Sequence, residues 1–60
     1  MSKEMELLKS KMEMYKRLIN VYDEMNFVTK SNKFDYKIKE YQDMLLDVYR
    51  RVQELIKENE

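Results

Sequence analysis

The chain has 60 residues, with 12 Lys or Arg, 12 Asp or Glu, and a formal net charge of zero. It contains no Cys, His, Gly or Pro. This excludes disulfides, thiolate or imidazole metal ligands, Cys or His as catalytic nucleophile or base, and strong helix breakers. A single core in so short a chain seldom supplies more than ~3–5 kcal/mol, so we expect one domain, residues 1–60, that is stabilised by association.

The same composition limits the classes of function. We expect no enzyme, no cofactor and no metal site. No apolar run approaches the ~18 residues of a membrane span, and the first residues lack the apolar segment of a signal peptide. We therefore expect a cytoplasmic protein without a membrane partner. The abundance of Lys, Glu, Tyr and Met is typical of AT-rich genomes such as those of phages, plasmids and low-GC bacteria.

The first predicted helix covers about residues 2–28, with Ser2 as its N-cap and Glu4 and Glu6 in the first turn, where the helix dipole favours acidic side chains. Two apolar stripes follow it with alternating spacings of four and three residues, as in coiled coils. The first stripe comprises Met1, Met5, Leu8, Met12, Tyr15, Ile19 and Tyr22. The second stripe comprises Leu7, Met14, Leu18, Val21, Met25 and Val28, with Lys11 in its one empty position.

At about 100° per residue the two stripes lie roughly 110° apart on the helix surface. A surface helix normally carries one apolar stripe, so the pattern indicates two neighbouring helices. Residues 29–32, Thr-Lys-Ser-Asn, favour a turn. Asn32 is a candidate cap for the next helix, with Asp35 in the capping-box position, and Ser31 is an alternative cap.

The second predicted helix covers about residues 33–57. Its apolar seam comprises Phe34, Ile38, Tyr41, Leu45, Val48, Val52 and Leu55. Neither stripe of the first helix continues in phase into this seam, which argues against one long helix. Three i,i+4 ion pairs are expected along the two helices: Glu13–Arg17, Asp35–Lys39 and Asp47–Arg51.

These elements predict an all-α fold, an antiparallel two-helix hairpin. The hairpin leaves one stripe of the first helix exposed, which is more apolar surface than a soluble monomer usually shows. We therefore expect a homodimer, a four-helix bundle with coiled-coil packing. The second stripe is its predicted oligomer interface: Leu7, Met14, Leu18, Val21, Met25 and Val28.

Asn26 allows two interpretations. It falls in the next position of the first stripe, where a polar residue can select one helix alignment. Alternatively, it is a C-cap with Phe27 folding back over the helix end, which we favour because the turn is near.

The predicted function is that of a small protein–protein interaction module, a regulator, adaptor or inhibitor. Its candidate partner surface comprises Lys30, Lys33, Tyr36, Lys37, Tyr49, Arg50 and Arg51. One alternative is an RNA- or DNA-binding dimer that uses the lysines and aromatic rings of the hairpin tip, although zero net charge disfavours it. Another is a subunit of a hetero-oligomeric helical complex, in which the second stripe meets a different chain.

Overall fold

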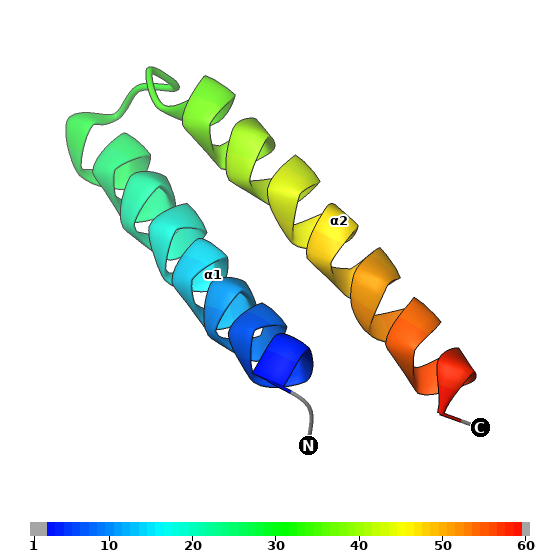
Figure 1. Ribbon diagram of the computed structural model, residues 1–60. Coiled ribbons are helices and arrows are strands. Elements are labelled where there is room, and N and C mark those ends of the chain that lie inside the picture. Colours follow the sequence, from blue (N-terminus) through cyan, green and yellow to red (C-terminus); the bar gives the residue numbers. More distant parts are fainter. Residues whose placement is uncertain (1–2, 60) are drawn as a thin grey trace.

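The computed structural model describes residues 3–59, which form two helices, α1 (Lys3–Thr29) and α2 (Asp35–Glu58). Figure 1 shows them side by side and antiparallel, with the connection at one end and the start of α1 and the end of α2 at the other. The predicted all-α hairpin is confirmed. The predicted cap Ser2 and stripe member Met1 lie outside the described residues.

The first stripe of α1 faces the seam of α2. Leu8 on α1 and Val48 and Leu55 on α2 are buried. The partly buried side chains that pack against them are Met5, Met12, Tyr15 and Val52. This half of the hairpin, farthest from the connection, is aliphatic apart from Tyr15, because both seams carry Leu, Met or Val there.

The half nearer the connection is closed by aromatic rings. Tyr41 of α2 lies between Tyr15 and Tyr22 of α1, with centroid separations of 6.0 Å to each and nearly parallel planes. Phe34 continues the row against Tyr22, at 5.6 Å. Offset aromatic pairs at these separations stabilise beyond the area they bury. The three tyrosines predicted for the seams therefore lie at the helix interface, where each is half-buried.

The hairpin core is nevertheless small. Among residues 3–59, three hydrophobic residues are buried, and each of them still exposes 6–9 % of its surface. Fully burying a Leu or Val side chain contributes about 1.5–3 kcal/mol. Three such side chains give little margin over the conformational entropy of ordering two long helices.

The first helix ends in a Schellman motif. The amide of Ser31 donates to the carbonyl of Asn26 (3.0 Å), and the amide of Lys30 donates to the carbonyl of Phe27 (3.2 Å). Both bonds satisfy carbonyls that a helix end leaves free. The motif requires a left-handed residue, and here it is Lys30, at φ 52°. For a residue with a Cβ, that conformation costs roughly 1–2 kcal/mol.

We expect Lys30→Gly to stabilise the protein by about 0.5–1 kcal/mol, since glycine adopts positive φ without the Cβ penalty but is more flexible when unfolded. Urea unfolding followed by circular dichroism measures this change. Lys33→Gly is the matched control, because Lys33 lies in the same connection and has no positive φ; it should be neutral or destabilising. A loss of stability with Lys30→Gly would contradict the strained cap.

The second helix is capped by a side chain of the first. Asn26 accepts a hydrogen bond from the amide of Phe34 at Oδ1 (3.0 Å) and donates from Nδ2 to the carboxylate of Asp35 (2.8 Å). Phe34 is the N-cap residue of α2 and makes no side-chain cap bond. The predicted Asn32 cap is therefore wrong, because only the backbone carbonyl of Asn32 is engaged, by the amide of Asp35.

The predicted C-cap role of Asn26 is also wrong. Asn26 lies inside α1, which continues to Thr29, and its half-buried side chain links the two helices. These bonds tie the first turn of α2 to a single position on α1. We therefore expect Asn26 to favour one alignment of the hairpin, which is the other interpretation of a polar residue in this stripe.

We expect Asn26→Asp to destabilise the hairpin by about 1–2 kcal/mol, because it removes the donor to Asp35 and places two carboxylates together. Adding Asp35→Asn should recover most of the loss, since the carboxylate introduced at position 26 could then accept from the new amide and still accept from the backbone of Phe34. Thermal unfolding of the two variants tests this compensation. Equal stability of Asn26→Asp and the wild type would show that the bridge contributes nothing.

Candidate functional site

The second stripe of α1 lies on the surface of the hairpin. Its exposed fractions are 58 % for Leu7, 46 % for Met14, 51 % for Val21, 38 % for Met25 and 77 % for Val28, and Leu18 is half-buried. The stripe is continuous from Met14 to Val28 and is interrupted only at Lys11. A contiguous apolar strip along a helix marks an interaction surface more often than isolated exposed side chains do.

One side-chain contact between the helices identifies the edge of the hairpin on which the stripe lies. Glu4 of α1 pairs with Arg51 of α2 at 3.0 Å, and a step of seven residues from Glu4 returns to the same edge at Lys11, Leu18 and Met25. The same step back from Arg51 reaches Met44, which is 37 % exposed. Met44 thus belongs to the same edge and extends it onto α2.

The opposite edge of the hairpin is marked by Lys16, whose Nζ lies 5.9 Å from the ring centroid of Tyr49. Leu46 and Ile56 of α2, 55 % and 49 % exposed, lie three residues before and seven residues after Tyr49. They therefore belong to this edge and provide controls for the second stripe.

The stripe ends in a hollow beside the connection. The hollow has a volume of about 300 Å³ and is lined by Val21, Glu24, Met25, Val28, Thr29 and Phe34. Four of these six side chains are apolar, and Glu24 is the one charged group at its rim. The hollow is thus a mainly apolar, concave part of the hairpin surface.

The hairpin tip offers less to a nucleic acid than its composition predicts. Phe34 turns into the helix interface against Tyr22, which leaves Tyr36, 65 % exposed, as the remaining ring of the predicted pair. The ammonium of Lys37 lies 5.7 Å from the Tyr36 centroid. Lys30 and Lys33 are exposed.

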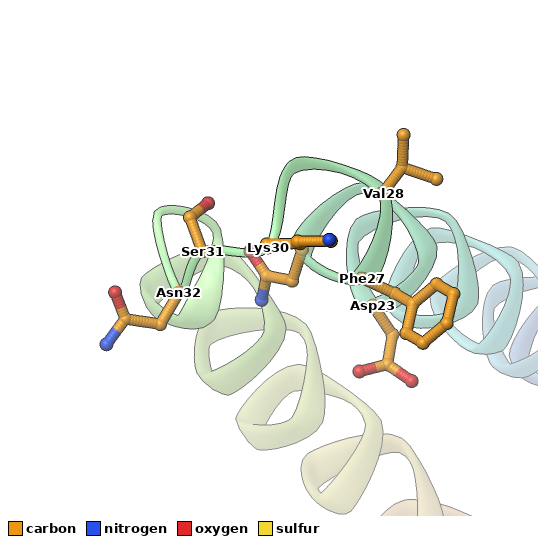
Figure 2. A pocket seen from close by; sticks show the side chains of 7 residues that line it. Asp23, Phe27, Val28, Lys30, Ser31 and Asn32 are labelled. Carbon is orange, nitrogen blue, oxygen red and sulfur yellow. The ribbon is translucent and has the colours of Figure 1, made fainter.

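A second depression lies on the outer side of the tip and is open to solvent. It is lined by Asp23, Asn26, Phe27, Val28, Lys30, Ser31 and Asn32. Figure 2 shows Asp23 and Phe27 projecting from the same side of α1, whereas Val28 points away. Phe27 is 84 % exposed, so the prediction that it folds back over the helix end is wrong.

Of the predicted partner residues on α2, Arg51 forms its ion pairs with acidic side chains of the same chain. Its guanidinium donates to both carboxylate oxygens of Glu4 and to Glu54, and Glu58 lies 3.8 Å away. These bonds, that to Glu4 first, raise the pKa of Arg51 above its ordinary value. Arg50 pairs with Asp47 at 3.6 Å. Tyr49 is half-buried beneath Lys16.

The three expected i,i+4 ion pairs do not form within residues 3–59. Asp47 pairs with Arg50 instead of Arg51, and Arg51 reaches across to α1. Arg17 and Lys39 make no ion pair with their expected partners. Exposed pairs of this kind gain little over hydration, so spacing alone selects among them weakly.

Within the described chain, no three acidic side chains gather in a way that could hold a metal ion. Neither α1 nor α2 is long and apolar enough to cross a membrane. Comparisons of this chain with protein families, with curated proteins and with solved structures found no match. The function of this chain is therefore inferred from the surface of the hairpin.

Proposed function

We propose that this chain is a small, non-enzymatic protein–protein interaction module that acts as a homodimeric four-helix bundle. The observation that carries the proposal is the second stripe, five of whose six side chains are exposed in the hairpin. Burying such side chains contributes about 1.5–3 kcal/mol each. A second copy of the hairpin can bury these side chains. The small hairpin core contributes little stability by itself, so this additional burial would stabilise the fold.

The size of the hairpin supports pairing between copies. Its Cα extents are 47 × 15 × 11 Å, so its broad face measures roughly 700 Å², near the ~800 Å² that each partner contributes to a standard interface. A partner protein would then bind the surfaces that the dimer leaves exposed. At the hairpin tip these include Phe27, Tyr36 and Lys33, which are exposed.

A nucleic-acid-binding dimer receives less support. The lysines of the tip are accompanied by Asp23 and Asp35, and one of its two rings packs inward. Binding of random RNA at low salt, abolished by Lys33→Glu with Lys37→Glu, would favour that alternative over a protein partner.

The thermal unfolding of the wild-type chain at several concentrations tests the proposal. Folding coupled to dimerisation makes the unfolding midpoint rise with protein concentration. We expect the unfolding midpoint, measured from the helical signal in circular dichroism, to rise clearly over a hundredfold range of protein concentration. A midpoint that is independent of concentration would contradict a homodimer and would direct attention to a different chain as the occupant of the stripe.

A further inference from the structure

We infer that two copies pair α1 against α1 in antiparallel orientation, about a twofold axis that is perpendicular to both α1 helices and passes between them at the level midway between Leu18 and Val21. This inference rests on the proposed homodimer and adds its orientation, its register and the charged pairs that select them. The occupant of the second stripe is thus a second copy of the chain, aligned at one position along α1.

The orientation follows from the place of α2 beside the stripe. The two stripes of α1 lie roughly 110° apart, so α2 is to one side when the second stripe faces a partner. A twofold axis perpendicular to α1 keeps both α2 helices on the same side of the α1 pair, as a four-helix bundle requires. A twofold axis parallel to α1 places them on opposite sides.

The apolar layers limit the register. With the axis between Leu18 and Val21, Leu18 faces Val21 of the second copy, and Met14 faces Met25. The twofold repeats both layers, so four consecutive layers are entirely apolar. Lys11 falls opposite Val28 at each end, where its ammonium can reach water past its aliphatic stem.

Registers displaced by one heptad are poorer. A shift that increases the overlap places Lys11 against Val21 in two internal layers and Glu4 against Val28. The opposite shift also has four apolar layers, but it leaves Met14 as well as Leu7 without a partner residue and brings Glu24 against Glu24 of the second copy. The shift to greater overlap keeps four apolar layers but places Lys11 and Glu4 against valines, and charged groups in an interface are expensive unless they are paired.

Charge complementarity selects the same register. Arg17 and Glu24 border the stripe on the side away from α2, each within one turn of Val21. Both are exposed, and neither makes an ion pair within residues 3–59. In the inferred register Arg17 faces Glu24 of the second copy, and the twofold creates this pair twice. In the register with greater overlap, Arg17 faces Arg17 of the second copy.

The hollow beside the connection fits this arrangement. Met25 lines it together with Val21, Val28 and Phe34, and the residue that faces Met25 is Met14 of the second copy. A methionine side chain is flexible and fills irregular apolar spaces well. The hollow at each tip therefore receives a side chain from the middle of the other helix.

Disulfide trapping tests the inference, because the chain has no cysteine of its own. Bridged residues need Cα atoms within about 7 Å. The variant that carries both Met14→Cys and Met25→Cys should form a covalent dimer under mild oxidation. Each single variant should not, because like positions are then separated by about 16 Å along the helix. The two sites in one chain are equally far apart and cannot bridge internally.

The outcomes separate the possibilities. Rapid dimer formation by each single variant would show a parallel pair and overturn the inference while leaving the homodimer intact. If neither the single variants nor the double variant form a covalent dimer although the mass in solution is dimeric, the register is wrong. A monomeric mass would overturn the proposed function itself. Leu46→Cys, on the opposite edge and 55 % exposed, measures random collision.

Charge exchange provides an independent readout. Arg17→Glu and Glu24→Arg each convert two attractive pairs into two repulsive ones, and we expect each to raise the dimer dissociation constant about tenfold. The double exchange should restore wild-type affinity, because the pairs are rebuilt with reversed sign. Single exchanges without effect, or a double exchange that is additive, would overturn the pairing of Arg17 with Glu24.

Discussion

Replacing Val21 with glutamate is expected to raise the dimer dissociation constant at least about a hundredfold, because the twofold would bring two carboxylates into adjacent apolar layers without partners. In the isolated hairpin the Val21 side chain is 51 % exposed. A glutamate there would cost a monomer almost nothing. The loss of mass in light scattering, measured at a concentration where the wild type is dimeric, reports the change.

Leu46→Glu is the matched control for this substitution. Leu46 is exposed to nearly the same extent, 55 %, but lies on the opposite edge of the hairpin. It should leave the dimer unchanged. Equal effects of Val21→Glu and Leu46→Glu would show that general hydrophobicity, and not the second stripe, holds the copies together.

Replacing Leu8 with alanine is expected to destabilise the fold by about 2–4 kcal/mol, the range for removing a buried leucine. Leu8 is one of the three buried side chains and packs with Val48 and Leu55. A loss of this size approaches the whole stability of a core in so short a chain. We expect the thermal midpoint to fall by ~10 °C or more, with helical content already reduced at low temperature.

Leu46→Ala is the control for the core, since the same atoms are removed from a side chain that is mainly exposed. A change within about 0.5 kcal/mol is expected there. If Leu8→Ala were equally mild, the aliphatic half of the hairpin would contribute little to its stability, and the aromatic row near the connection would have to account for it.

The hairpin and its internal faces could be predicted from the sequence because heptad spacing depends only on helix geometry. The first stripe and the α2 seam alternate four and three without a break, and both lie at the observed interface. The phase change between them required a turn. Exposure of the second stripe followed from the same reasoning, because a single neighbour cannot cover two stripes.

The connection could not be predicted in the same way. The cap of α2 comes from Asn26, eight residues before the amide it accepts from, whereas capping rules consider only adjacent residues. The left-handed position is Lys30, because α1 continues to Thr29 and the residue that follows the helix end closes the Schellman motif. Propensity is a weak guide where tertiary hydrogen bonds decide the backbone.

The polar contacts were the least predictable part of the surface. Arg51 was expected to pair with Asp47 on its own helix, but it bonds Glu4 of α1. The choice depends on which side chain the second helix brings within reach, and this is known only after the helices are aligned. That pair in turn identifies the edge to which Met44 belongs.

The mass of the wild-type chain in solution decides whether the hairpin forms a homodimer. One chain has a mass of 7.5 kDa. Light scattering over a wide range of concentration should give twice that value, with a helical circular dichroism spectrum, and should fall toward one chain only on strong dilution. A folded, helical monomer at the highest concentration would contradict the account, because the second stripe would then remain in water without a second copy to cover it.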